Sequence, residues 1–275
     1  MSVRLRDVLA GQLGTLRREP TPRRVRARLA GRTVVDSTRA VLVWEPRRLL
    51  PAYAVPAGDV DAPIEPDPGD LPADPGGTRL TDVGDRLVLD PRVPFGVHTA
   101  DGEPVLVRAG DRTAAGFRLA DPDLAGYLLL DFAGFDAWYE EDEQRFAHPR
   151  DPYHRIDVLP SSRHVRLERD GVLLASSAGP RLLHETMLPV RYYLPRHDVL
   201  VPLRDSGTRT WCAYKGEASY LSAEVGGELV PDLLWTYPEP LVDAAPVRGL
   251  VSFFDERLDV VLDGVRLERP NTPWS

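Results

Sequence analysis

The sequence predicts a mainly β protein, built from two small antiparallel β domains that follow a short N-terminal helix. Three observations predict it: short runs of alternating or β-branched residues, two-residue turn signals between such runs, and a similarity between the two halves of the chain. The runs at 25–29, 33–35 and 41–43 are typical of strands. The turn signals that separate apolar runs are Ala30-Gly31, Asp101-Gly102, Asp170-Gly171, Gly226-Gly227 and Asp263-Gly264.

The first 20 residues are predicted to form a short amphipathic helix. Val8, Leu9, Leu13 and Leu16 follow helical spacing, and Pro20 ends the pattern. Such a helix can dock on the body of the protein or on a partner, and we expect the first.

The two halves resemble each other at an offset of about 140 residues. This offset places Gly31 on Gly171 and Glu45 on Glu185. We therefore predict a first β domain over residues 21–155 and a second over 156–275, as tandem copies. The first copy is expected to be degenerate, because nothing in it matches residues 211–216 and because it carries a Pro/Asp-rich insertion at 56–90. Within that insertion, the repeated prolines of 56–77 predict a loop without strand pairing.

Composition excludes several classes of protein. The 275 residues are 43% hydrophobic and 28% charged, with a net charge of -8, which is typical of a globular chain and not of a disordered, collagen-like or membrane protein. The charge argues against nucleic acid or anionic membranes as partners. The basic stretch 4–48 and the acidic stretch 59–90 are interpreted as solvated faces that pair with each other rather than as a nucleic-acid patch.

A single cysteine and the absence of a long apolar run predict a cytoplasmic protein without a signal peptide. The sequence contains no phosphate-binding glycine loop, dinucleotide fingerprint, nucleophile elbow or zinc-protease helix. The six histidines show no metal-ligand spacing. We therefore expect neither a cofactor nor a metal.

Lys215 is the feature that most suggests a site. Of the 34 basic residues it alone is lysine, and it lies three residues from Cys212, the only cysteine. Arginine cannot replace an amine that must deprotonate or act as a compact ammonium. Lys215 could thus bind an anion or, with a lowered pKa, act as base or nucleophile, with Cys212 as a possible thiolate. The alternative is a buried structural cysteine beside an exposed turn lysine.

Aromatic residues are dense in the second half, and a few of them could wall a pocket. Glu185 stands alone as an acid in the apolar segment 182–190, so it lies either at a cleft or in an exposed turn. The catalytic candidates are Lys215, Cys212 and Glu185. The predicted ligand-binding residues are Glu185, Tyr193, Asp198, Cys212, Lys215, Tyr220 and Trp235.

The second copy resembles the domain-of-unknown-function 427 family, which automatic labelling sometimes calls a nucleotidyltransferase. The resemblance rests on Glu185, on segments 190–195 and 212–220, and on Trp235-Thr236-Tyr237-Pro238. It implies a small antiparallel β-tent similar to methionine sulfoxide reductase B domains. The paired Cys-x-x-Cys zinc motifs of those relatives are missing from this sequence, as is the Gly-Ser and Asp-x-Asp pair of nucleotidyltransferases.

The leading hypothesis is that the second domain binds a small polar or anionic metabolite in an aromatic-walled pocket, with catalysis left open. An alternative is a protein–protein interaction module, which includes a homo-oligomer. A weaker alternative is a thiol-dependent enzyme that uses Cys212.

Overall fold

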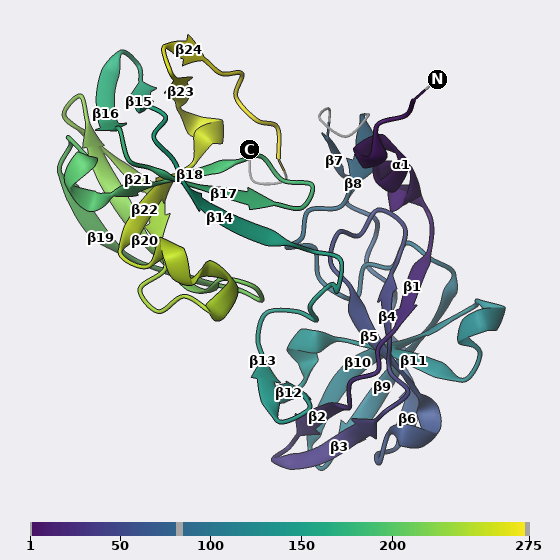
Figure 1. Cartoon of the computed structure of the whole chain (residues 1–275). Helices are drawn as coiled ribbons and strands as arrows, with labels where there is room; N and C mark the ends of the chain where they lie inside the picture. Colours follow the sequence, from purple (N-terminus) through teal and green to yellow (C-terminus); the bar gives the residue numbers. More distant parts are fainter. Residues whose placement is uncertain (1, 81–84, 273–275) are drawn as a thin grey trace. The chain divides into compact units, whose positions relative to one another are not determined.

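A computed structural model describes residues 2–80 and 85–272 of the chain. The chain divides into two compact units, unit 1 over Met1–Asp151 and unit 2 over Pro152–Ser275. Both are mainly β and antiparallel (Figure 1).

Unit 1 begins with α1 (Leu5–Gly11) and a 3-10 turn, η1 (Gln12–Gly14). Its strands are β1 (Arg17–Pro20), β2 (Val25–Leu29), β3 (Arg32–Ser37), β4 (Val41–Trp44), β5 (Ala52–Pro56), β6 (Ile64–Pro66), β7 (Thr78–Leu80), β8 (Arg86–Val88), β9 (Gly102–Ala109), β10 (Arg112–Leu119), β11 (Tyr127–Leu130), β12 (Ala137–Glu140) and β13 (Glu143–Arg145). Its other 3-10 turns are η2 (Ala57–Asp59), η4 (Pro122–Leu124) and η5 (Phe132–Gly134).

Two sheets form the body of unit 1. A seven-stranded sheet has the order β1-β4-β5-β11-β10-β9-β6, and a four-stranded sheet has the order β13-β12-β2-β3. The main core contains residues of both sheets, such as Leu29 and Leu42. Alternation along β4 sends Val41 and Val43 to the opposite face of the larger sheet, where a second apolar cluster also contains Phe117 and Leu129.

Unit 2 has β14 (Ile156–Pro160), β15 (Val165–Arg169), β16 (Val172–Ser177), β17 (Arg181–Glu185), β18 (Arg191–Pro195), β19 (Leu203–Cys212), β20 (Gly216–Val225), β21 (Glu228–Thr236), β22 (Leu250–Phe253), β23 (Asp259–Leu262) and β24 (Val265–Arg266). Its 3-10 turns are η6 (Arg196–Asp198), η7 (Val242–Val247) and η8 (Asp255–Arg257).

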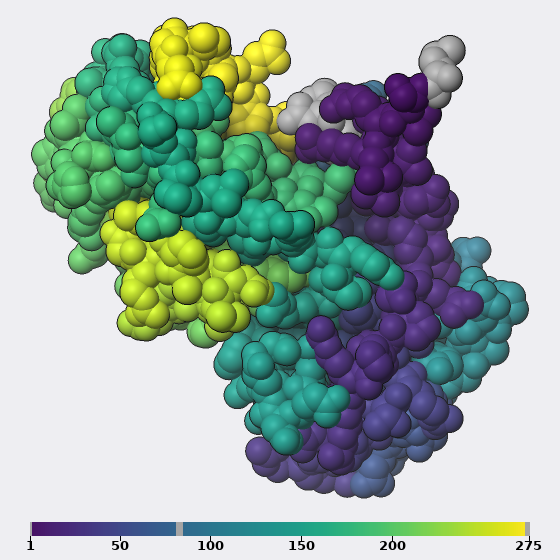
Figure 2. All heavy atoms as spheres, in the orientation of Figure 1, coloured from purple at the N-terminus to yellow at the C-terminus, as the bar shows by residue number. Residues whose placement is uncertain are grey.

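The larger sheet of unit 2 carries an apolar cluster on each of its two faces. Its order is β14-β17-β18-β22-β21-β20-β19, and the smaller sheet is β16-β15-β23-β24. One apolar cluster, which includes Leu182 and Leu194, joins the two sheets. A second cluster on the other face of the larger sheet includes Leu183, Tyr193 and Trp235, together with Ala244 and Val247 of η7. The η7 segment, yellow-green in the space-filling view, forms part of the outer surface of unit 2 (Figure 2).

The two units share one strand order. When β7 and β8 are set aside, each strand of unit 1 corresponds in sequence to the strand of unit 2 that holds the same place in its sheet. The register agrees as well, because Leu42 faces Tyr53 where Leu182 faces Tyr192. The isolated bridges Val35–Val60 and Ala175–Val199 also coincide.

The structure corrects the predicted N-terminal helix. The helix ends at Gly11, and residues 17–20 form β1, which pairs with the edge of β4. Two glycines at 11 and 14 weaken a helix here, and the backbone groups of residues 17–20 are satisfied instead by the sheet. Ala10 and Leu13 are buried, whereas Leu5, Val8 and Leu9 are exposed.

Two further predictions are wrong. The proline-rich stretch does pair, since Ile64–Pro66 forms an edge strand beside β9, where a proline is tolerated. The Asp101-Gly102 pair does not close a hairpin, because Gly102 is the first residue of β9 and pairs with Leu119. The other four turn signals connect paired strands as predicted.

Candidate functional site

The candidate site lies on the η7 side of the larger sheet in unit 2, opposite the core between the sheets. Glu185 is the last residue of β17, and alternation puts it on the same face as Leu183 of that cluster. Lys215 comes from the tight turn between β19 and β20, where Cys212 pairs with Gly216. The topology therefore brings together two residues that are 30 positions apart in the sequence.

Gly216 fixes the path of this turn. Its φ is +97°, and a Cβ there would lie 3.2 Å from the Glu239 carbonyl oxygen. The Leu241 N–H donates a 3.0 Å hydrogen bond to the Lys215 carbonyl oxygen. A glycine is needed both for the positive φ and for this close approach, so the backbone of Lys215 is held against the segment that leads into η7.

Lys215 and Glu185 form a buried ion pair. The Nζ atom donates to both carboxylate oxygens at 2.6 Å. The side chains are only 12% and 6% exposed. Burial by itself would raise the pKa of Glu185, but the Lys215 charge and the hydrogen bonds from Lys215 and His154 lower that pKa to about 2.

The ion pair also determines the protonation state of Lys215. Burial would lower the pKa of Lys215, but the Glu185 carboxylate outweighs it and the pKa is raised. The expectation of a lowered pKa, which a base or nucleophile would need, is therefore wrong for this arrangement. In this arrangement Lys215 is an ammonium that donates hydrogen bonds to the Glu185 carboxylate.

His154 is a third member of the cluster, and the sequence prediction did not select it. Its Nε2 lies 2.9 Å from Oε1 of Glu185, and its ring stacks on Tyr214 at 4.3 Å between centroids. It precedes β14, whose Ile156 pairs with Glu185. Only this strand pairing brings His154 to the site, so no local pattern marks it.

Tyr193 and Trp235 form a buried polar contact beside the ion pair. The Trp235 indole N–H donates a 3.0 Å hydrogen bond to the Tyr193 hydroxyl. Burial is the main cause of the raised pKa of Tyr193, while the Lys215 charge acts in the opposite direction. Tyr237, which the prediction also did not select, is buried in the same cluster, and burial raises its pKa as well.

Of the remaining predicted residues, Cys212 and Tyr220 pack against the apolar cluster on this face, whereas Asp198 lies outside it. Cys212 is partly buried and packs against the apolar cluster that contains Tyr193. The Tyr220 hydroxyl lies 2.9 Å from Thr210 Oγ1, and its ring stacks on Phe254. Asp198 lies in η6, where its Oδ1 is 3.5 Å from Nε2 of His197, and it forms no hydrogen bond or ion pair with Glu185 or Lys215. We therefore define the site as the Glu185–Lys215–His154 cluster, with Tyr193 and Trp235 beside it.

Unit 1 has a carboxylate at the equivalent place. Glu45 lies three residues after Leu42, as Glu185 lies three after Leu182, and it is 2% exposed. Its Oε2 accepts from the Thr99 N–H at 2.7 Å and the Ala100 N–H at 3.2 Å, and its Oε1 lies 2.8 Å from His98 Nδ1. The segment at 98–100, which precedes β9, thus corresponds to the turn before β20. Main-chain N–H groups donate to Glu45, whereas the Lys215 ammonium donates to Glu185.

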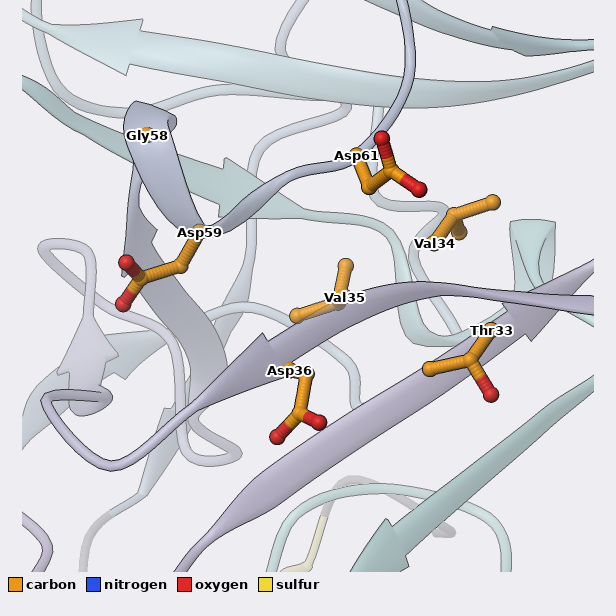
Figure 3. A pocket seen from close by; sticks show the side chains of 7 residues that line it. All are labelled: Thr33, Val34, Val35, Asp36, Gly58, Asp59 and Asp61. Atoms are coloured by element: carbon orange, nitrogen blue, oxygen red, sulfur yellow. The ribbon is translucent and has the colours of Figure 1, made fainter.

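A shallow pocket of about 390 Å³ lies elsewhere in unit 1 (Figure 3). Its lining includes Asp36, Asp59 and Asp61. Arg24 pairs with Asp36, and Ser37 and Arg39 donate to Asp59. Three carboxylates make this pocket unsuitable for an anion.

Over residues 2–80 and 85–272 there is no group of three or more His, Cys, Asp or Glu side chains that could hold a metal ion. Within the same ranges, no helix is long and apolar enough to cross a membrane.

Comparison with known proteins identifies the family of unit 2. Residues 157–264 match the family described as Domain of unknown function (DUF427), so the chain carries a domain of this family. The matched range contains Glu185 and the 212–216 turn, whereas His154 lies just before it. A comparison with curated proteins found no match.

Proposed function

We propose that unit 2 binds a small anionic metabolite at the Glu185–Lys215–His154 cluster. The observation that carries the proposal is the burial of the only lysine of the chain against a carboxylate that also contacts a histidine. Apolar residues of similar volume are often as stabilising as a buried ion pair, so stability alone does not account for these charges.

The surroundings of the pair support binding of a small molecule. Aromatic side chains of Tyr193, Tyr214, Trp235 and Tyr237 lie in or next to the cluster, which matches the apolar lining with a few polar groups that ligand sites have. His154 retains 18% exposure of its side chain and Lys215 retains 12%, which provides a starting point for access from solvent.

We infer further that the two units arose as tandem copies and that binding is confined to unit 2. The shared strand order and register support the duplication. In unit 1 the position of Lys215 corresponds to Thr99, whose main-chain N–H already satisfies Glu45. A cytoplasmic setting is proposed on the basis of the single cysteine.

A thermal-shift screen tests the proposed function. Wild type and Lys215→Arg are compared against nucleotides, sugar phosphates, amino acids and organic acids, with Arg209→Lys on exposed β19 as the control variant. Because ligand binding stabilises the folded state, an anion should raise the Tm of wild type and of the control more than that of Lys215→Arg. Equal shifts in all three proteins would place binding elsewhere, and no shift with any compound would refute the proposal.

An interaction module is the second candidate, and the exposed face of α1 favours it. Leu5, Val8 and Leu9 follow helical spacing and are 70%, 47% and 53% exposed. The variant Leu5→Glu/Val8→Glu should then lower the oligomeric mass measured by light scattering. A wild-type chain that is monomeric at all concentrations would remove a homo-oligomer as the partner.

A further inference from the structure

Glu185 itself occupies the position in which an external anion would sit. Both of its oxygens lie 2.6 Å from Lys215 Nζ, and one also contacts His154. The ammonium and the imidazole therefore already hold a carboxylate that belongs to the chain. We propose that the ligand of this site is a carboxylate, and that it binds by replacing the Glu185 carboxylate on Lys215 and His154. This inference rests on the proposed function above and specifies its ligand class.

The two donors are held in place independently of the Glu185 side chain. The Leu241 N–H fixes the backbone of Lys215, and the stack between His154 and Tyr214 ties the imidazole to the residue next to Lys215. The backbone of Glu185 is paired with Ile156 in the sheet. Rotation of the Glu185 side chain can therefore vacate the donors without breaking the strand pairing.

The geometry favours a carboxylate over a phosphate. Lys215 Nζ lies 2.6 Å from each of the two carboxylate oxygens of Glu185, so a ligand carboxylate can place its oxygens in the same two positions. A phosphate would bring additional oxygens into a site where the protein side chain now presents only two. Buried acceptors without partners are unfavourable, so phosphate should bind less tightly.

Unit 1 provides the contrasting case. Glu45 accepts from the main-chain N–H groups of Thr99 and Ala100. A ligand could take its place only if the 98–100 loop kept its conformation after the Glu45 side chain had moved away. No lysine is present in unit 1, because Lys215 is the only one in the sequence. An external carboxylate should therefore not replace Glu45.

The test compares carboxylate binding by wild type, Glu185→Gln and Glu45→Gln, all as the full chain. Acetate, pyruvate, succinate and benzoate are titrated at constant ionic strength, with phosphate and chloride as other anions. Lysine labelled with ¹³C reports on Lys215 alone, because the chain has a single lysine. A neutral amide competes less well for an ammonium than a carboxylate does, so Glu185→Gln should bind the best carboxylate at least about tenfold more tightly than wild type.

Glu45→Gln should bind with the affinity of wild type, and phosphate should shift the Lys215 signal less than the carboxylates do. Glu185→Asp, which keeps the charge on a shorter side chain, should fall between wild type and Glu185→Gln and guards against a folding defect of the amide variant. Equal or weaker carboxylate binding by Glu185→Gln would overturn displacement while leaving the proposed function intact. The absence of any Lys215 response to any of these anions, in wild type and variants alike, would overturn both.

Discussion

The ammonium of Lys215 lies 2.6 Å from both carboxylate oxygens of Glu185, and both side chains are almost fully buried. The pair connects the end of β17 to the turn between β19 and β20, which lie four sheet positions or more apart in the strand order. Each charge is tolerated inside the protein only because the other is present. The ion pair therefore links two distant parts of one sheet, and the stability of each buried charge depends on the other.

Loss of one member of this pair should be strongly destabilising. Lys215→Met leaves Glu185 buried without its ammonium, and we expect the free energy of unfolding to fall by about 3 kcal/mol. The double variant Lys215→Met/Glu185→Leu should regain most of that loss, because no buried charge remains. Urea unfolding measures the free energy of unfolding of both variants.

The matched control breaks an exposed ion pair of the same unit. Arg204 contacts Glu224 on the surface, with side chains 66% and 34% exposed. Arg204→Met should reduce stability by less than about 1 kcal/mol, because solvent screens exposed charges. A Lys215→Met effect no larger than that of Arg204→Met would show that the buried pair is unimportant for stability.

Acid should destabilise unit 2 through Glu185. Its pKa is lowered to about 2 in the folded state, so below the ordinary value of 4.5 the unfolded chain binds more protons. The contribution of Glu185 is fully present above about pH 4.5 and is lost as the pH falls towards 2. Between pH 5 and 2.5, wild type should lose Tm more steeply than Lys215→Met/Glu185→Leu; parallel curves would contradict the assignment.

The strands could be predicted from the sequence because their signals are local. Ala30 and Gly31 have φ values of 51° and 75°, and Asp170 and Gly171 have values of 52° and 79°. Two consecutive positive φ values define the turn that matches the twist of a hairpin, and Asp-Gly or Ala-Gly letters between apolar runs indicate it. Asp101-Gly102 has the same letters without the hairpin, since the strand that precedes it in the sequence is not its partner.

The site was only partly predictable, because only some of its residues are marked by a local sequence signal. Lys215 stands out by composition and Glu185 by its apolar neighbours, and the structure does bring them together. His154 carries no such mark, because its contact with Glu185 depends on the pairing of β14 with β17. Asp198, predicted as a ligand-binding residue, lies in the turn η6, which corresponds to η2 of unit 1, and not at the ion pair.

Asp255 should make unit 2 less stable as the pH rises towards neutrality. It is 3% exposed, its Oδ1 has no hydrogen-bond partner among the described residues, and Arg191 lies 3.5 Å from its other oxygen. Burial raises its pKa to about 7, with Glu256 adding to the increase and Arg191 opposing it. The folded state thus binds more protons than the unfolded state between about pH 4 and 7, and stability falls with rising pH in that window.

Asp255→Asn removes this titration. We expect the variant to gain about 2 kcal/mol relative to wild type at pH 8 and little at pH 4, because the penalty of a buried charge is absent. Asp170→Asn, at a side chain that is 82% exposed, should follow the wild-type pH profile. Urea unfolding at the two pH values measures the difference, and an unchanged pH slope in Asp255→Asn would rule out Asp255 as its source.

Glu45 should protect two main-chain N–H groups of unit 1 from exchange with solvent. Its carboxylate accepts from Thr99 and Ala100 and contacts His98, which in turn stacks on Phe117 at 3.6 Å between centroids. Glu45→Gln replaces the charged acceptor with a neutral amide oxygen, which accepts weaker hydrogen bonds, so both N–H groups are held less firmly.

Hydrogen exchange measured by NMR should therefore be faster at Thr99 and Ala100 in Glu45→Gln, by about tenfold for a lost stabilisation of about 1.4 kcal/mol. Glu185→Gln should leave these two amides at the wild-type rate, because the carboxylate of unit 2 is held by side chains instead. Unchanged exchange at both amides in Glu45→Gln would mean that the charge of Glu45 does not stabilise the loop before β9.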